Sequence, residues 1–392
     1  MSRGKGLPAG SALLLAVAIV GCDGGALGPV DLSGGFRRIA VGADHSCGLA
    51  ADGSAFCWGA GYDGRLGTGD DESRNVPARV AGGRTFVSLG VGASHTCALD
   101  PAGVAYCWGA NSNGELGADH TNSAGVPTAV ATDARFASIS GGSAHTCAVT
   151  ATGELYCWGD NTHGQTAAPA AQNVLSPRRV ETDLTFDAVS AGSFHTCGVT
   201  RAGAAYCWGG NGLGQLGDGT QVDRQAPTEV GGGHQFRQLS AGHMHTCGVT
   251  LEGTLLCWGS SVHGELGNFA SAPPPISGAV LPHPVTLPLS FALVDAGYHF
   301  TCAVDTQTGA WCWGRAPDGQ LGNGRRLDAW SPQPVVAGGP EAIRLQDVSA
   351  GLTHACGVTT VGTALCWGRG DSGQLGIGAR TLSTLAIRVR TE

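Results

Sequence analysis

The sequence predicts an all-β protein, a seven-bladed β-propeller of four-stranded blades. Three observations support this: a cysteine pair recurs seven times, each unit of about 50 residues offers four short apolar segments, and no unit shows a helical period. An open solenoid would need polar capping units, whereas the first and last units here are ordinary members. A closed ring needs no caps, because every blade has two neighbours.

Each unit opens with a short apolar segment, which is followed by a glycine and then, in most units, a histidine. In the first unit these are Phe36, Ile39, Gly42 and His45. The histidines are His45, His95, His145, His195, His245 and His354, two residues before a cysteine, and His299, three before. Symmetry-related side chains in a wide ring lie too far apart to share one metal ion, so we predict a structural role, in which each histidine bonds the backbone of an adjacent turn.

A hairpin with paired cysteines follows. Cys47 and Cys57 flank Ala51-Asp52-Gly53, and a glycine in the left-handed region at Gly53 would place the two cysteines opposite each other, within disulfide reach. In the sixth unit the glycine, Gly309, is displaced by one, so that turn should differ. Buried free thiols are one alternative, and a metal site would need shorter spacings. The predicted disulfides are Cys47–Cys57, Cys97–Cys107, Cys147–Cys157, Cys197–Cys207, Cys247–Cys257, Cys302–Cys312 and Cys356–Cys366.

The second cysteine of every pair is followed by Trp-Gly, then by a turn resembling Gly-Gln-Leu-Gly and a last strand, often Pro-x-x-Val. We expect the tryptophan to cover the contact between blades and to bond its N–H. The third unit breaks the turn at Thr166-Ala167. Because the final strand, Ala386–Val389, ends close to the C-terminus, we predict that it joins the N-terminal strands in one composite blade; the alternative is that each unit is itself one blade.

The N-terminus has the pattern of an export signal. Arg3 and Lys5 precede a short apolar run, and Ile19-Val20-Gly21-Cys22 resembles a bacterial lipobox. Seven pairs leave Cys22 as the odd cysteine of 15, and export supplies the oxidising compartment that disulfides need. We therefore expect a signal peptide at 1–21, lipidated Cys22 with a flexible tether at 22–35, and the propeller at 36–392. In the alternative reading the signal is cleaved elsewhere and Cys22 is incidental.

At this point the motifs resemble a known family, that of the regulator of chromosome condensation repeat. The fourth unit shows the pattern in Gly192, His195, Thr196, Gly203, Trp208, Gly209, Asn211, Gly214, Gln215, Leu216, Gly217, Pro227 and Val230. The resemblance covers most of the chain and implies a seven-bladed propeller. It also implies that members can act as nucleotide exchange factors for a GTPase, or inhibit β-lactamases when secreted by bacteria. No exchange motif can be placed on these residues, and the paired cysteines suggest an exported branch.

Composition and motifs narrow the function. Without residues 1–21 the formal charge changes from −8 to about −10, because Arg3 and Lys5 are lost, which argues against a nucleic-acid partner. No nucleotide-binding, zinc-protease or serine-hydrolase motif is present, so we expect no catalytic residues, cofactor or metal. A hydrolase or metal enzyme acting in the channel is a third alternative. Large loops that depart from the repeat occur in the fifth unit (Pro273, Pro274, Pro275) and the sixth (Arg325, Arg326).

We therefore expect an exported, monomeric, membrane-anchored lipoprotein of the cell envelope, attached through Cys22. It would bind a protein or glycan partner through one rim of the ring. Inhibition or regulation of a secreted enzyme is an alternative, and nucleotide exchange follows from family analogy alone. Aromatic residues that break the repeat are the candidate contacts: Tyr62, Tyr298, Trp311 and Trp330.

Overall fold

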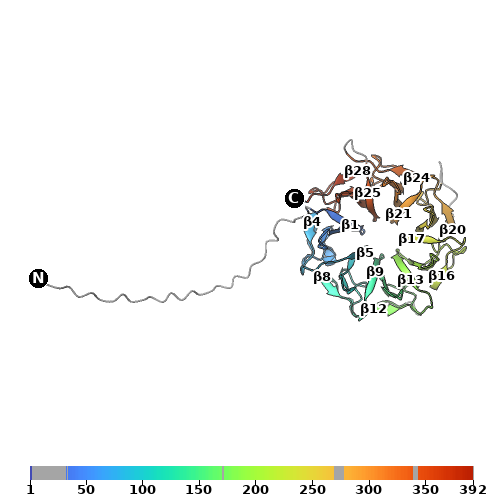
Figure 1. Ribbon diagram of the computed structural model, residues 1–392, viewed down its shortest axis with the longest axis horizontal. Helices are drawn as coiled ribbons and strands as arrows, with labels where there is room; N and C mark the ends of the chain where they lie inside the picture. Colours follow the sequence, from blue (N-terminus) through green and yellow to red (C-terminus); the bar gives the residue numbers. More distant parts are fainter. Residues whose placement is uncertain (2–31, 33, 170–171, 269–277, 339–342, 392) are drawn as a thin grey trace.

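The computed structural model describes residues 1, 32, 34–169, 172–268, 278–338 and 343–391. Seven four-stranded antiparallel sheets surround a central axis, which confirms the predicted seven-bladed propeller (Figure 1). Each blade contains four consecutive strands in sequence order. No helix in the described ranges is long and apolar enough to cross a membrane. The predicted signal peptide, Cys22, most of the tether and Pro273–Pro275 lie outside the described residues, although Leu32 is described and is buried.

The first strand of each blade lies nearest the axis and the fourth lies outermost (Figure 1). The first strands are β1 (Phe36–Val41), β5 (Ser88–Val91), β9 (Phe136–Gly141), β13 (Phe186–Ala191), β17 (Phe236–Ala241), β21 (Phe291–Ala296) and β25 (Leu345–Ala350). The fourth strands are β4 (Arg74–Arg79), β8 (Ala124–Ala129), β12 (Val174–Arg179), β16 (Arg224–Glu229), β20 (Ala279–Pro284), β24 (Ala329–Pro334) and β28 (Ser383–Arg388).

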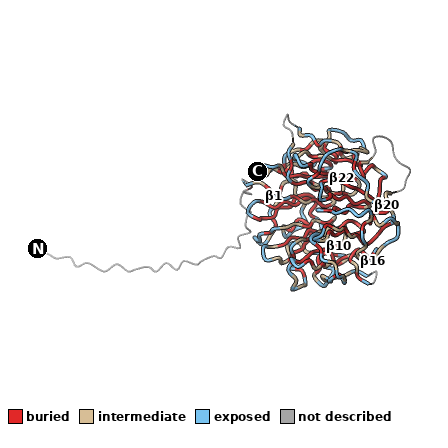
Figure 2. Tube along the Cα trace, turned by 45° about the vertical axis from the view of Figure 1, so that its right-hand side comes forward, coloured by how far each residue is buried: buried red, intermediate tan, exposed pale blue. Residues whose placement is uncertain are grey.

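The two middle strands of each blade form the buried interior, as the red segments of Figure 2 show. The second strands are β2 (His45–Ala50), β6 (His95–Leu99), β10 (His145–Thr150), β14 (His195–Thr200), β18 (His245–Thr250), β22 (Phe300–Asp305) and β26 (His354–Thr359). The third strands are β3 (Ala55–Gly59), β7 (Ala105–Gly109), β11 (Leu155–Gly159), β15 (Ala205–Gly209), β19 (Leu255–Gly259), β23 (Ala310–Gly314) and β27 (Ala364–Gly368). A short 3-10 helix, η1 (Tyr62–Gly64), follows β3.

All seven predicted cysteine pairs are disulfides that join the second and third strands of one blade. In the first blade Cys47 and Cys57 lie directly opposite each other, with their Cα atoms 4.1 Å apart. Gly53 has the expected left-handed backbone, with φ of +85°. In the sixth blade Thr308 takes that conformation, at φ +71°, which confirms that this turn differs.

The prediction of a composite blade is wrong. β28 pairs with β27 of its own unit, and β1 pairs with β2, so each unit is one blade. The reason is geometric: β1 is an inner strand and β28 an outer strand, so they lie at opposite edges of their sheets. The ring closes instead through side chains of the seventh blade, which accept hydrogen bonds from the backbone of β1. The backbone N–H of Ile39 donates to Asp347 Oδ2 (3.0 Å), and that of Val41 donates to Ser349 Oγ (3.2 Å).

Side chains of neighbouring blades also satisfy other inner edges, which have no further strand to pair with. Ser190 Oγ accepts the N–H of Ala241 at 2.9 Å, and Ser240 Oγ accepts that of Ala296 at 2.9 Å. Outer edges are protected differently: six of the seven outer strands carry proline at their fourth position, where an N–H is lost. β28 has Ala386 there, and its N–H donates to Val336 O of the sixth blade at 3.0 Å.

Two residues of the loop between β11 and β12 in the third blade depart from the repeat and should destabilise the protein. Ala167 adopts φ +55° where the other units place glycine, and buried Thr166 replaces leucine, with its Oγ1 unpartnered in the described structure. We expect Thr166→Leu/Ala167→Gly to raise the free energy of unfolding by about 1–3 kcal/mol, because it removes left-handed strain and a buried unpaired hydroxyl. Chemical denaturation measures this change.

The matched control applies the opposite change to the fourth blade. Gly217→Ala should destabilise, because a Cβ there would lie 2.6 Å from Trp258 Nε1. Equal stability of the repaired and native chains would show that the third-blade turn carries no strain.

Candidate functional site

One face of the ring, here called the turn face, carries the turns between the first and second strands and the loops between the third and fourth. The other, the hairpin face, carries the disulfide hairpins and the connections between blades. On the turn face the histidines link neighbouring blades. His145 Nε2 lies 2.8 Å from Thr196 Oγ1 of the next blade, and His354 Nε2 lies 2.9 Å from Ser46 Oγ, which closes the ring. The same pairing occurs at His45–Thr96, His95–Thr146, His195–Thr246 and His245–Thr301.

A backbone carbonyl fixes the direction of each of these hydrogen bonds. Thr196 Oγ1 donates to Gln165 O at 2.8 Å, so its single proton is used and the hydroxyl must accept from the Nε2–H of His145. Trp208 Nε1 donates to the same carbonyl at 3.0 Å. This confirms the role predicted for six of the seven tryptophans, whose N–H groups reach the preceding blade: Trp58, Trp158, Trp208, Trp258, Trp313 and Trp367. The exception is Trp108, whose buried Nε1 has no hydrogen-bond partner in the described structure.

Six of these histidines are structural, as predicted, although they bond a side chain rather than the backbone of a turn. Burial holds their imidazoles neutral: it lowers the pKa of His195 to about 3 and of His145 to about 4. The seventh assignment was wrong. Phe300, not His299, occupies the equivalent place in the sixth blade, and residue 355 of the next blade is alanine rather than threonine. Both lie in one apolar cluster, so donor and acceptor are absent together at this joint.

The turn face is hollowed at the axis. A cavity of about 250 Å³, here called the well, is lined by the glycine of each first turn and by the residues beside it. Ala43, Ala93, Ser143 and Ser193 line the part formed by the first four blades, and His243, Tyr298 and Leu352 line the part formed by the last three. The well is therefore lined by small residues on one side and by larger, partly aromatic residues on the other.

A continuous series of aromatic and imidazole rings extends from the well across the third to sixth blades. The rings of His243 and Tyr298 stack, with centroids 3.6 Å apart, and His299 contacts both, at 5.2 Å and 4.6 Å. The series is completed by His163–Phe194 (5.2 Å), Phe194–His243 (5.3 Å) and His263–His299 (5.1 Å). These six residues, here called the ring patch, come from first turns and third–fourth loops of four successive blades.

Carboxylates hold three of the four imidazoles of the ring patch in place. Asp223 Oδ2 lies 3.5 Å from His163 Nδ1, Asp328 Oδ2 lies 3.3 Å from His263 Nδ1, and Glu265 Oε1 lies 3.5 Å from His299 Nδ1. All three pairs join neighbouring blades. Within the described ranges no group of three or more histidine, cysteine, aspartate or glutamate side chains could hold a metal ion.

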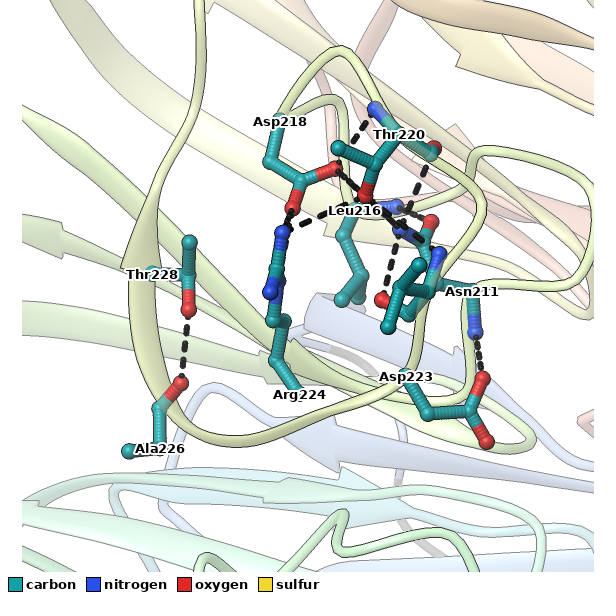
Figure 3. Close-up of polar contacts among 9 residues, drawn as sticks. Asn211, Leu216, Asp218, Thr220, Asp223, Arg224, Ala226 and Thr228 are labelled. Carbon is teal, nitrogen blue, oxygen red and sulfur yellow. Dashed lines mark hydrogen bonds and ion pairs between the residues drawn. The ribbon is translucent and has the colours of Figure 1, made fainter.

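Figure 3 shows how the loop that carries Asp223 is fixed in the fourth blade. Asp223 Oδ1 accepts the N–H of Asn211 at 2.7 Å, and Asp218 accepts from Arg224 Nε at 2.8 Å and from Thr220 Oγ1 at 2.7 Å. Burial alone would raise the pKa of Asp218, but hydrogen bonds from Thr220 and Arg224 outweigh it and lower that pKa. The loop is thus pre-organised, and it presents a fixed carboxylate to His163.

The four predicted contact residues have different positions. Tyr298 lies in the ring patch beside the well. Trp330 lies nearby, over Gly264, where a Cβ would come within 3.1 Å of the indole. Tyr62 is on the same face but on the first blade, 51% exposed, with the Arg65 guanidinium 4.9 Å from its ring. Trp311 belongs to β23 and is partly buried, and its N–H is bonded to Asp305 Oδ2 at 2.9 Å, so it is not available to a partner.

The sequence interpretation missed most of the ring patch. His163, Phe194, His243 and His263 were not selected as candidate residues. The signal was present: when the units are aligned, positions 163 and 263 are histidine where other units have Asp63, Asn113, Leu213, Asp318 and Ser372. What the sequence lacked was the neighbour relation between blades that brings these positions together.

The architecture defines the class of protein as a seven-bladed, disulfide-containing β-propeller. A family model for the RCC1-like domain matches residues 25–286, and models for the regulator of chromosome condensation (RCC1) repeat match residues 309–358 and 346–374. The chain therefore belongs to the RCC1-like family, which confirms the predicted resemblance.

Individual relatives share shorter stretches or the fold. The mitochondrial RCC1 domain-containing protein RUG3 of Arabidopsis thaliana is 36% identical over 92 residues, which cover 24% of this chain and 20% of that protein. Human WBSCR16 has a similar structure, with a TM-score of 0.76 and 22% identity, covering 86% of this chain and 94% of that one. Prp20p of Saccharomyces cerevisiae, studied for its binding to Gsp1p and histones, gives a TM-score of 0.71 at 22% identity over 80% of each chain. The match to RUG3 thus spans about one fifth of that curated relative's length, and the solved structures establish the fold.

Proposed function

We propose that this chain is an exported binding module whose turn face, in the sector of the ring patch, recognises a protein partner. The observation that carries the proposal is the concentration of repeat-breaking aromatic and imidazole residues beside the well. The repeat alone needs none of them, since the first two blades fold with small or polar residues there. Concave surfaces with aromatic residues and fixed polar groups are typical of binding sites.

Family membership supports binding rather than chemistry. Prp20p, which shares the fold, binds proteins, and no catalytic motif was found in this sequence. The activities of the curated relatives are not transferred, because the local matches cover only a small part of them.

Site-specific photo-crosslinking tests the binding face. A photoreactive phenylalanine analogue would replace Tyr298 on the turn face or, as a matched control, Val361 on the hairpin face, which is 84% exposed. In the envelope of the producing organism, we expect the full chain to form a protein adduct from position 298 and not from position 361. Adducts from position 361 alone, or equal adducts from both positions, would contradict the proposal.

We further propose that the module is exported and lipid-anchored at Cys22. Seven disulfides are typical of an oxidising compartment, which supports export. We expect mass spectrometry of the mature chain to find lipid on Cys22 and no residue before it, and Cys22→Ser to lose the lipid. An unlipidated mature chain that begins elsewhere would refute the anchor while leaving the binding face untouched.

A further inference from the structure

Resting on the proposed function, a more specific partner chemistry follows from the shape and charge of the turn face. We propose that it binds an acidic protein segment, which inserts one bulky apolar side chain into the well and directs its carboxylates toward arginines of the sixth blade.

The size of the well suits one side chain. Its volume of about 250 Å³ is below the roughly 300 Å³ at which small-molecule sites usually begin. The seven first-turn glycines and small residues such as Ala43 and Ala93 leave it open, while stacked Tyr298 and His243 form an aromatic wall on one side. An aliphatic or aromatic side chain of a partner would be desolvated against this wall, as anchor residues are in other interfaces.

On the turn face, the loop between β23 and β24 of the sixth blade carries three arginines together with Asp318 and Asp328. Arg315, Arg325 and Arg326 belong to the loop between β23 and β24, and none of them has a carboxylate partner in the described structure. The backbone N–H of Arg315 donates to His299 O at 2.9 Å, so this loop adjoins the ring patch. Leu327, in the same loop, is 70% exposed. Leu327 follows Arg326 directly, so the loop offers a partner an apolar contact beside two unpaired cations.

The rest of the molecule restricts how an anionic partner can approach. The formal net charge is −8, and the equivalent loop of the first blade carries Asp70, Asp71 and Glu72, which outnumber Arg74, the ion-pair partner of Asp70 and Glu72. An acidic segment is therefore repelled by the first blade and attracted by the sixth, which gives it one orientation. A flat anionic membrane fits less well, because it would meet the acidic loop as well and could not enter the well.

Selection from a displayed library of random short peptides tests this inference on the full chain. We expect the recovered peptides to combine a leucine or aromatic residue with aspartate or glutamate. Their affinity should fall about tenfold in Arg325→Glu/Arg326→Glu and decrease with added salt. Ala43→Trp, which fills the well, should lose binding. The control, Arg178→Glu on β12 of the third blade, should keep it; Arg178, like Arg325 and Arg326, has no carboxylate partner in the described structure.

The outcomes separate this inference from the proposed function. Peptides without an acidic bias, or acidic peptides whose affinity is unchanged by charge reversal and by salt, would overturn the inference, while crosslinking from position 298 would still support a protein-binding face. Arginine-dependent binding to phosphatidylglycerol vesicles, without selection of acidic peptides, would also overturn it. The salt dependence is measured on the native chain, so the test does not depend on the folding of any variant.

Discussion

The free energy of unfolding should fall steeply as the pH decreases from 6.5 toward about 4. Burial lowers the folded-state pKa of His95, His195 and His354 to about 3 and of His145 and His245 to about 4, and holds that of His45 well below 6.5. Below pH 6.5 the unfolded chain therefore binds more protons than the folded one, and stability that is complete above 6.5 is lost. Each histidine contributes at most about 1.4 kcal/mol per pH unit.

One carboxyl group acts in the opposite direction. Burial raises the pKa of Asp347 to about 6, despite Arg38 nearby, so the folded state holds a proton between pH 6 and 3.8 that the unfolded state has lost. This contribution increases stability as the pH falls through that window. Burial also raises the pKa of Asp295, which acts in the same direction. Two carboxyls cannot offset six histidines. Denaturant unfolding with intact disulfides, repeated across this pH range, measures the net effect.

The joint between the sixth and seventh blades supplies the control. The double variant His145→Phe/Thr196→Ala copies the natural Phe300–Ala355 pair, so we expect it to fold. Its free energy of unfolding should decrease less on acidification, because one buried histidine is missing. Thr196→Ala alone should cost about 1–3 kcal/mol, because it leaves the Nε2–H of His145 buried without an acceptor. A stability that is constant from pH 6.5 to about 4 would show that these imidazoles do not control acid unfolding.

Deletion of Leu385–Glu392 should destabilise the whole ring, on the order of 5 kcal/mol. The deletion removes most of β28, including Ala386, and also Val389, which is 1% exposed and shares a core cluster with Phe36 and Trp58 of the first blade. Loss of Val389 would open the joint between the seventh and first blades, although β28 does not pair with β1. Thermal unfolding followed by circular dichroism measures the change.

A shorter deletion, of Thr391 and Glu392 only, is the matched control and should leave the melting temperature unchanged, as is usual for chain ends outside the core. If the longer deletion also melted at the native temperature, the seventh blade would not need its outer strand.

Local patterns in the sequence were sufficient for most of the fold. The glycine at position 53 and the ten-residue cysteine spacing determined the hairpin and its disulfide, because both partners lie in one unit. The closure of the ring was not predictable in this way, since it depends on which edge of each sheet faces the axis. The same distinction applies to the site: Tyr298 and Trp330 could be found because they break the repeat individually, whereas His163 gains its meaning from Phe194 and Asp223 in the next blade.

The closing joint uses the same contacts as the other joints: His354 meets Ser46, and Trp58 meets Gln374 O, as in the pairs elsewhere in the ring. Phe36 and Val389 lie in one cluster, and the C-terminal end reaches the first blade in Figure 1. Between β4 and β5, Gly82 and Gly83 have open space where a side chain would be. A circularly permuted chain, cut there and joined at the old ends, would meet the same neighbours in the same order. The contacts of this ring therefore do not specify which repeat must be translated first.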